Sequence, residues 1–501
     1  MSSTGLSRRD LLARAGAGAA AALVVGWNTT TRAWADAPGP QVEQLPALDG
    51  AVTLVSGELD RFSSDFGHIV RQSPRAVLRP GSVRDVQRVV AFAQRHRIAV
   101  AVNGQSGDAA KLGTAGLESH SSYGQANPRG GIAIDARGLS RIVSVRPGRA
   151  VVEAGATWAQ LTDAALATGW APPCLTDYLH LSIGGTLSVG GIGGGVRHHG
   201  LQTDTVESVQ VVTGTGELVE ASRERHRDLF EAVLAGVGQA GVIVRVTLRL
   251  VPARARAHVF SLYYDDLATY LADQQRVLAD GRFDLQAGEA LHPADGGHWR
   301  YKAELVAHGD EGEPVDREAL LAGLNPVAAE TTVVEQSWRE YAFRVDGFAE
   351  YLRAAGFWNL PKPWLSLFLP ASATPEFMAA AQAELGPADL GAGILLFYPY
   401  AREPISTPLA VLPDSPVGWH FDLLAFPGPG ADVQAALRRN RRLHDLAVRL
   451  GGKRYPIGAV PDLTEADWRR HYGALWGRVQ RAKRRFDPAG VLTPGQGVHA
   501  S

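Results

Sequence analysis

The chain has 501 residues, of which 45% are hydrophobic and 20% are charged, and this length and composition are typical of a soluble chain with two or three domains. Its 51 acidic residues nearly cancel its 50 basic ones, so no global electric field attracts nucleic acid, and we expect no nucleic-acid partner. The single cysteine, Cys174, excludes an internal disulfide and a thiolate metal cluster.

The first 35 residues have the features of a twin-arginine signal peptide. Ser7-Arg8-Arg9-Asp10-Leu11-Leu12 is a twin-arginine pattern, and the apolar run from Ala15 to Val25 follows it. That run is shorter than the roughly 20 residues of a membrane-spanning helix, so we expect no stable membrane anchor. Ala33-Trp34-Ala35 has the small residues that signal peptidase cleaves after, which predicts a secreted chain that begins near Asp36. A frayed helix with a chance arginine pair is the alternative.

The next 200 residues predict a mixture of strands and helices. The expected strands are 76–80, 98–102, 131–134, 142–145, 151–153, 206–213 and 241–251, and the expected helices are 83–95, 157–168 and 227–234. Ser82 is in position to cap the first helix. Because strands and helices do not alternate strictly, the pattern favours an α+β fold over a doubly wound parallel sheet.

The composition changes at about residue 253, where the glycine clusters thin and aromatic residues and prolines increase. Aromatic side chains gather in the segments 357–364 and 397–400, which indicates a second domain. The chain ends with a basic helix predicted over 465–486, followed by Thr493-Pro494-Gly495-Gln496.

The segment from Thr176 to Gly195 is the most informative part of the sequence. Seven of the twelve residues from 184 to 195 are glycine, interleaved with Thr186 and Ser188. Such a segment can turn backbone N–H groups and hydroxyls toward one anionic ligand, and a diphosphate fits that description. The spacing matches neither a P-loop nor the Rossmann pattern, which excludes both interpretations. A merely flexible loop is the alternative.

A second candidate segment, Ser119 to Ala126, contains a histidine, and a lone histidine in a loop is usually a surface residue. Together with other segments, however, it resembles the landmarks of flavin oxidoreductases of the vanillyl-alcohol-oxidase type, and within that group the sequence resembles the cytokinin dehydrogenases. The segments that carry the resemblance are 119–126, 177–188, 238–243, 357–370 and 494–496.

The resemblance implies a two-domain α+β architecture with a PCMH-type FAD-binding fold. The FAD-binding domain would span residues 65–252, and a substrate or cap domain with an antiparallel sheet would span 253–445. The segment 446–501 would complete the FAD-binding domain.

The resemblance also implies the cofactor contacts. His120 matches the histidine that attaches covalently to the 8α-methyl group of FAD, with Ser121 and Gln125 close to the flavin. The remaining expected contacts are Asp177, Ser182, Gly184, Gly185, Ser188, Ile192, Ile243, Tyr455, Thr493 and Gln496. A rival alignment without the insertion 106–118 places Gln105 at the histidine position and leaves FAD bound without a covalent link.

The expected reaction is oxidation of a C–N or C–O bond of a small, planar substrate by hydride transfer to flavin N5. Asp177 is the acid that adjoins the glycine cluster on its N-terminal side, and it would accept the substrate's proton. O2 or a quinone-like acceptor would reoxidise the flavin. The alternatives are an oxidase of a sugar, an alcohol or a berberine-like compound, and an exported protein that binds a flavin or a carbohydrate without turnover.

Three departures from the family pattern qualify these expectations. The glutamate that holds the adenine ring in plant relatives is missing from the matching stretch 284–288, so we expect cytokinins to be poor substrates. Ser119 replaces a glycine before the flavin histidine. Cys174 lies ten residues before Gly184, too far for a second flavin link, and is interpreted as an ordinary small side chain.

Two smaller features have ordinary explanations. The neighbours His198 and His199 lack a carboxylate partner, so a polar loop edge is favoured over a metal site, and we expect no metal. The basic run 438–442 is expected to be a solvated helix face rather than an anion-binding patch.

Overall fold

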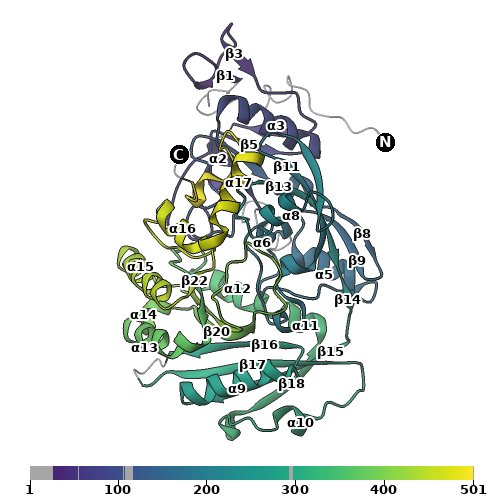
Figure 1. Cartoon of the computed structure of the whole chain (residues 1–501), viewed down its shortest axis with the longest axis vertical. Helices are drawn as coiled ribbons and strands as arrows, with labels where there is room; N and C mark the ends of the chain where they lie inside the picture. Colours follow the sequence, from purple (N-terminus) through teal and green to yellow (C-terminus); the bar gives the residue numbers. More distant parts are fainter. Residues whose placement is uncertain (1–25, 55, 105–106, 108–116, 293–296, 500–501) are drawn as a thin grey trace.

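The computed structural model describes residues 26–54, 56–104, 107, 117–292 and 297–499 (Figure 1). The twin-arginine pattern, the apolar run after it, Gln105 and most of the insertion 106–118 lie outside the described residues. Within the described ranges, no helix has both the length and the hydropathy needed to cross a membrane.

The predicted cleavage pattern forms a strand of a small sheet. β2 (Ala33–Ala35) and β3 (Val42–Gln44) both pair antiparallel with β1 (Gly26–Asn28). Trp34 Nε1 donates a hydrogen bond to the carbonyl oxygen of Gly130, 2.8 Å away. The small sheet therefore contacts the body of the uncleaved chain.

Two sheets form the first half of the protein, which we call the N-terminal unit. The smaller sheet has the order β4 (Ala51–Thr53), β5 (Ala76–Arg79), β7 (Ile132–Asp135), β6 (Val100–Asn103), and β7 runs parallel to β5 and β6. The larger sheet is antiparallel and has the order β12 (Leu218–Ser222), β11 (Val206–Thr213), β13 (Gly241–Arg249), β9 (Arg149–Glu153), β8 (Ile142–Arg146). The predicted α+β class is confirmed, because parallel and antiparallel pairing occur without regular crossovers.

α3 (Val83–His96) covers the smaller sheet, because its apolar residues recur at helical spacing and are buried against the strands. Ser82 lies at the N-cap position, but its hydroxyl does not cap a helical N–H group. The Asp85 carboxylate instead accepts hydrogen bonds from the N–H groups of residues 49, 50 and 81. The start of the helix is thus stabilised by an acid in its first turn.

An eight-stranded antiparallel sheet, here called the cap sheet, forms the second half. Its order is β18 (Thr332–Ser337), β15 (Arg256–Tyr264), β17 (Arg300–Gly309), β16 (Leu285–Leu291), β20 (Ile394–Ala401), β21 (Val417–Leu424), β19 (Leu365–Pro370), β22 (Lys453–Arg454). One face packs in a hydrophobic core with α9 (Leu267–Asp280), α13 (Thr374–Glu384) and α15 (Val433–Arg449). Because side chains alternate along a strand, the intervening residues face the other way. Several of them line the cavity described below.

The C-terminal segment returns to the N-terminal unit, where it appears in yellow in Figure 1. The single helix predicted over 465–486 is wrong: α16 (Glu465–Tyr472) and α17 (Trp476–Phe486) are separated by a 3₁₀ turn. Gly473 begins that turn with a φ of 52°, a conformation that glycine adopts at low cost. Beyond α17, Val100 N–H donates to Val491 O and Thr493 N–H donates to Val100 O, each at 2.8 Å.

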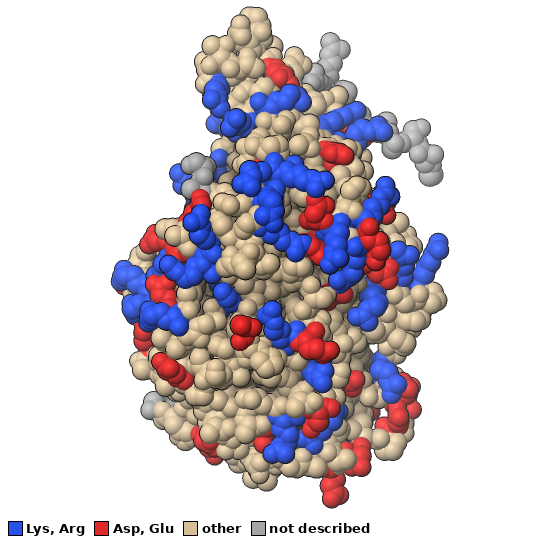
Figure 2. All heavy atoms as spheres, viewed as in Figure 1, with Lys and Arg blue, Asp and Glu red and all other residues tan. Residues whose placement is uncertain are grey.

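The other regular elements are short and lie between these sheets and helices: α2 (Ser56–Arg61), α5 (Trp158–Leu166), β10 (Trp170–Ala171), α6 (Ile183–Leu187), α7 (Val196–His199), α8 (Arg227–Val233), β14 (Val251–Pro252), α10 (Arg317–Leu321), α11 (Trp338–Ala342), α12 (Val345–Ala354) and α14 (Pro387–Leu390). Acidic and basic side chains are interspersed over the face shown in Figure 2.

Candidate active site

A cavity of about 400 Å³ is lined by residues of both the N-terminal unit and the cap sheet. All of the residues that the sequence predicts to contact the cofactor or to act in catalysis line this one cavity. They are His120, Ser121, Gln125, Asp177, Ser182, Gly184, Gly185, Ser188, Ile192, Ile243, Tyr455, Thr493 and Gln496. Segments that are almost 400 residues apart in the sequence therefore meet around one space.

The glycine cluster has two functions in the structure. Of its seven glycines, Gly184 and Gly185 line the cavity. The others serve the backbone: Gly191 has a φ of 73°, and a Cβ atom on Gly193 would lie 1.8 Å from the carbonyl oxygen of Leu175. A Cβ atom on Gly185 would approach only Ser182 Oγ among the described atoms, so this glycine leaves room on the cavity side. The cavity is thus lined by one end of the glycine cluster, and the other glycines allow tight turns and close approaches of the backbone.

His120 is held among aromatic rings at the cavity wall. Its ring stacks on Phe66 with 4.0 Å between centroids and an interplanar angle of 16°, and it lies 5.4 Å from the ring of Tyr178. Burial, together with the nearby cations Lys362 and Arg353, lowers the pKa of the His120 imidazole to about 3. The imidazole is therefore neutral at physiological pH, as a nucleophilic nitrogen must be.

The loop that carries His120 is fastened to the segment around Phe66. Phe66 N–H donates to Ser119 O at 2.7 Å. The Asp65 carboxylate accepts hydrogen bonds from the Ser121 hydroxyl at 2.8 Å and from Gly124 N–H at 2.7 Å. Burial raises the pKa of Asp65 to about 7. These contacts fix the position of the His120 backbone on both sides of the histidine.

Lys362 reaches the segment around Phe66 from the second half of the chain, and the sequence did not reveal this role. Its ammonium group is fully buried and donates to the carbonyl oxygens of Phe66 at 2.7 Å, Trp358 at 2.5 Å and Leu360 at 2.9 Å. It also lies 4.1 Å from the centroid of the Phe66 ring, which itself stacks on His120. Burial lowers the pKa of Lys362 to about 7. The cap thereby helps to position His120.

Asp177 forms an ion pair with Arg344, for which no motif in the sequence indicated a role. Arg344 Nη2 contacts Asp177 Oδ1 at 2.5 Å, and Arg344 Nε contacts Glu304 Oε1 at 3.1 Å. The network continues through Lys302 Nζ, which lies 3.3 Å from Glu304 and 3.5 Å from Glu289. Asp177, Arg344, Glu304 and Glu289 all line the cavity. No motif links these residues, because they come from four separate segments.

The two glutamates of this network have different protonation tendencies. Burial opposes ionisation of Glu304, but Arg344 and Lys302 outweigh it and hold the pKa of Glu304 below its ordinary value. At Glu289 burial is the largest effect and raises the pKa, although Lys302 opposes it. Of the two, Glu304 is therefore the more firmly ionised, whereas Glu289 binds a proton more readily.

These glutamates change the expectation about the missing adenine contact. Gln286 lies off the cavity and donates to the carbonyl oxygen of Gln274 at 2.7 Å. Ala287 lines the cavity, and Glu289 follows two residues later on the same face of β16. Glu304 is the direct antiparallel partner of Ala287. Two carboxylates therefore flank the position where the sequence lacks an acid.

The C-terminal residues add polar groups to the cavity. Tyr455 Oη accepts a hydrogen bond from Gly191 N–H at 3.2 Å, and Thr493 Oγ1 donates to Gly238 O at 3.0 Å. Gln496 Oε1 is buried without a hydrogen-bond partner in the part of the chain that the structure describes. An unpartnered acceptor at a cavity wall calls for a ligand donor. The unpartnered Gln496 oxygen, the neutral His120 imidazole and the space beside Gly185 together fit the expected FAD.

Two smaller predictions can be compared with the structure. His198 Nε2 contacts the carbonyl oxygen of Phe283 at 2.8 Å, which is a structural role. Among the described residues, no group of three or more potential ligands is arranged to hold a metal ion. Cys174 is buried, and burial raises the pKa of its thiol to about 12.

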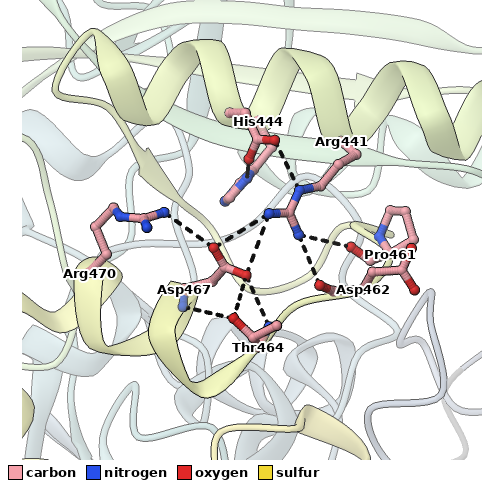
Figure 3. A network of polar contacts seen from close by, with 8 residues as sticks. Arg441, His444, Pro461, Asp462, Thr464, Asp467 and Arg470 are labelled. Carbon is pink, nitrogen blue, oxygen red and sulfur yellow. Dashed lines mark hydrogen bonds and ion pairs between the residues drawn. The ribbon is translucent and has the colours of Figure 1, made fainter.

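The basic run 438–442 is not a simple solvated face, so that expectation is wrong. Asn440 is fully buried and donates to the carbonyl oxygens of residues 363, 364 and 459, which supports the cavity-lining Trp364. Arg441 reaches the carbonyl oxygens of Pro461 and Asp462 and the carboxylate of Asp467 (Figure 3). These contacts tie α15 to the start of α16. Helical periodicity did not predict them, because the partners lie about 20 residues further along the chain.

Comparison with known proteins gives these features a family context. A family profile described as cytokinin dehydrogenase 1, FAD and cytokinin binding matches residues 284–499, and one described as FAD binding domain matches residues 74–222. An uncharacterized oxidoreductase of the fasciation locus of Rhodococcoides fascians is 35% identical over 433 residues, which cover 86% of this chain and 95% of that protein. Cytokinin dehydrogenases 10 and 3 of Oryza sativa subsp. japonica are both 34% identical over 87% of this chain, and the matches cover 86% and 89% of their lengths.

Proposed function

The chain belongs to the family of FAD-dependent oxidoreductases that contains the cytokinin dehydrogenases, and on this premise we propose that it oxidises a C–N bond of a small planar amine. N6-substituted adenines, the cytokinin class, are the first candidates. The observation that carries this proposal is the fixed Asp177 carboxylate in the same cavity as His120 and the glutamates beside Ala287. A protein that only stores a flavin has no use for these acids.

His120 is the proposed attachment point of the cofactor. Its neutral ring and its place between Phe66 and Tyr178 suit a nucleophilic nitrogen that must attack in one orientation. When bound, FAD supplies the hydride acceptor of the reaction. The backbone around Gly184 and Gly185, and the Gln496 side chain, are the proposed non-covalent contacts.

Asp177 is the proposed proton acceptor. Arg344 binds Oδ1 and orients the carboxylate, which leaves Oδ2 to accept the proton that the substrate nitrogen loses. The positively charged Arg344 and Lys302 pair with the acids of the network in a partly buried place, and they hold the pKa of Glu304 below its ordinary value. O2 or a quinone-like compound is the proposed final electron acceptor.

Oxidation of a C–O bond in an aromatic alcohol is the second candidate. The aromatic residues Tyr178, Trp358, Trp364 and Phe426 at the cavity favour a flat ligand over a free sugar, and they do so for an alcohol as well as for an amine. The acids of the network favour the amine, because carboxylates accept hydrogen bonds from N–H groups and stabilise positive charge.

Two measurements test the proposal. Acid-precipitated protein is expected to stay yellow and to show flavin fluorescence in a denaturing gel, as a covalent cofactor requires. Under anaerobic conditions, isopentenyladenine is expected to bleach the flavin faster than an aromatic alcohol or glucose does. Faster bleaching by the alcohol would overturn the substrate class, and a colourless precipitate would overturn the covalent link.

Export by the twin-arginine route is a further proposal, and it is supported by the order of the arginine pair, the apolar run and the Ala33-Trp34-Ala35 pattern. Cleavage after Ala35 would remove β1 and β2 together with the signal. Replacing both Arg8 and Arg9 by lysine is expected to keep the protein inside the cell. Secretion of that variant at the wild-type level would contradict the proposed route.

A further inference from the structure

One row of side chains crosses the cap sheet beside the cavity, and the proposed reaction uses only some of them. In the register of the sheet, Lys302 of β17 pairs with Glu289 of β16, Glu289 with Leu396 of β20, Leu396 with Asp422 of β21, and Asp422 with Ser366 of β19. Glu289, Leu396 and Asp422 line the cavity. An apolar platform, Leu396, therefore has an acid on each side.

Asp422 is a buried acid with one hydrogen-bond partner on its own sheet. Its exposed fraction is 5%, and the hydroxyl of Ser366 donates to Oδ1. Adjacent strands lie about 4.8 Å apart, so the backbones of β16 and β21, with β20 between them, are separated by about 10 Å. That separation matches a flat two-ring molecule lying on Leu396 between Glu289 and Asp422.

His420 stands beside Asp422 on the same face of β21 and also lines the cavity. It is 2% exposed, and neither of its ring nitrogens has a hydrogen-bond partner in the described part of the chain. The nearest carboxylate oxygen, Asp422 Oδ2, is 3.9 Å from Nε2. Buried polar atoms are normally paired, so two unpaired nitrogens at a cavity wall indicate a ligand that completes their hydrogen bonds.

We propose that Asp422 and His420 form a second polar contact for the substrate, which binds the edge of a nitrogen heterocycle on the side of Leu396 away from Glu289. The carboxylate accepts from a ring or exocyclic N–H group, and the imidazole supplies the complementary donor or acceptor. The ligand class is thus a planar heterocycle with N–H groups, which narrows the small planar amine of the proposed function, on which this inference rests. An aromatic alcohol offers a single hydroxyl to this pair and has no ring N–H group to contact the carboxylate as well.

The groups around Asp422 define a pH dependence for this contact. Burial raises the pKa of Asp422 to about 7, with Asp177 adding to the effect and Ser366 opposing it. Burial lowers the pKa of His420 to about 3, and it raises the pKa values of Tyr398 on β20 and Tyr455. Between pH 6 and pH 8.5, Asp422 is therefore the member of this group that changes from a neutral acid to a carboxylate, while the histidine and tyrosines stay neutral.

The test compares two probes on the FAD-loaded enzyme. Adenine has N–H groups and no oxidisable side chain, whereas quinoline is also a flat molecule of two fused rings but has no N–H group. Dissociation constants are measured from the change in flavin absorption at pH 6 and pH 8.5, for the wild type, Asp422→Asn and Ser366→Ala. His420→Phe serves as a second variant, because it keeps the ring that packs on Phe368 and Tyr398.

Adenine is expected to bind the wild type more tightly at pH 8.5 than at pH 6. Asp422→Asn should weaken adenine binding at pH 8.5 by about tenfold or more and remove this pH dependence, because a hydrogen bond to a charged group is lost. His420→Phe should weaken adenine severalfold, and Ser366→Ala should have a smaller effect than Asp422→Asn. Quinoline has no N–H group for the carboxylate, so it should bind the wild type, Asp422→Asn and Ser366→Ala alike.

Three outcomes would overturn the inference. The first is that adenine fails to bind the wild type or binds Asp422→Asn unchanged. The second is that Asp422→Asn weakens the binding of adenine and of quinoline equally, which indicates a packing role. The third is that Asp422→Asn alters the flavin content or the spectrum without ligand, which assigns the pair to the cofactor. Adenine is not oxidised, so these results are independent of turnover. If adenine binding depends on Asp422 but no amine bleaches the flavin, the proposed function fails and this site remains.

Discussion

The two walls of the cavity are built by different means. The wall from the N-terminal unit combines backbone, small and apolar side chains and Asp177 with the His120 loop, which Asp65 holds through Ser121 and Gly124. The wall from the cap sheet consists of charged and titratable side chains on alternate positions of neighbouring strands. One wall suits a cofactor whose structure does not vary. In the wall from the cap sheet, single side chains can be replaced without moving the backbone, and such replacements can change which substrate binds.

This difference predicts that substitutions in the wall from the N-terminal unit affect the cofactor and that substitutions in the wall from the cap sheet affect the substrate. Backbone contacts tolerate few changes, because Gly193 has a carbonyl oxygen where a Cβ atom would be. Glu289, Lys302 and Glu304 of the cap sheet are coupled by ion pairs through Arg344 to Asp177, so their replacement should alter rates and affinities. The following variants separate the two walls, from the largest expected effect to the smallest.

His120→Ala is expected to abolish covalent flavin incorporation, because the alanine has no nitrogen to form the bond. Flavin fluorescence in a denaturing gel measures this. Gln105→Ala should keep full fluorescence, which distinguishes the two alignments of the histidine loop. The exposed His226 provides a matched control, and His226→Ala should also be labelled. Fluorescence retained by His120→Ala would refute the assignment.

Asp177→Asn is expected to slow flavin reduction in single-turnover experiments by about 10²-fold or more, while the covalent flavin is retained. The amide keeps the size of the side chain but cannot accept the proton. Asp346→Asn is a suitable control, because Asp346 lies on nearby α12 and pairs with His180 without lining the cavity. Equal reduction rates in Asp177→Asn and the wild type would remove Asp177 from the mechanism.

Arg344→Gln is expected to lower kcat by about tenfold, because it breaks the contacts to Asp177 and Glu304 together. Arg344→Lys keeps the positive charge, but its single ammonium cannot reproduce the fork that joins the two acids, so it should fall between Gln and the wild type. If the lysine and glutamine variants are equally slow, geometry outweighs charge. A wild-type rate in Arg344→Gln would contradict an orienting role.

Acid is expected to destabilise the fold through its buried histidines. The pKa of His420 falls from its ordinary 6.5 to about 3 in the folded protein because of burial, so below pH 6.5 the unfolded chain binds a proton that the folded chain does not. Stability therefore rises with pH from about 3 to 6.5, by up to about 1.4 kcal/mol per pH unit for one histidine. His420→Phe should reduce the slope of urea-unfolding free energy against pH by about one proton. An unchanged slope would show that His420 does not titrate in this way.

Asp467→Asn should have the smallest effect, because it weakens the network in Figure 3 outside the cavity. The Asp467 carboxylate caps α16 through Thr464 and receives Arg441 and Arg470. We expect a loss of about 1 kcal/mol in the free energy of unfolding, since these groups are partly exposed. The reduction rate of the flavin should stay at the wild-type value, and a tenfold slower rate would show that this network acts on the site.

Local patterns in the sequence were sufficient for the elements that depend on neighbouring residues. The strand 206–213 has the predicted bounds, and the α3 helix follows from its apolar spacing. The predicted helix over 465–486 is broken at Gly473, and Ser82 does not cap α3, whose first-turn Asp85 instead binds the N–H groups of the preceding segments. In both cases a local conformational preference competed with another interaction, and only the folded chain shows which of them dominates.

The candidate site divides in the same way. His120, Asp177 and the glycine cluster stand in contiguous motifs, so the sequence by itself identified them and the family to which the chain belongs. Arg344, Glu304 and Asp422 stand in no motif, and Lys362 stands in the segment 357–370, which by itself indicates no such role. The roles of all four depend on which parts of the folded chain come together. Asp422 reaches the cavity because β21 pairs with β20 so that Leu396 lies opposite it. A shift of one residue would turn every side chain of the strand to the other face, so only the tertiary structure decided this wall.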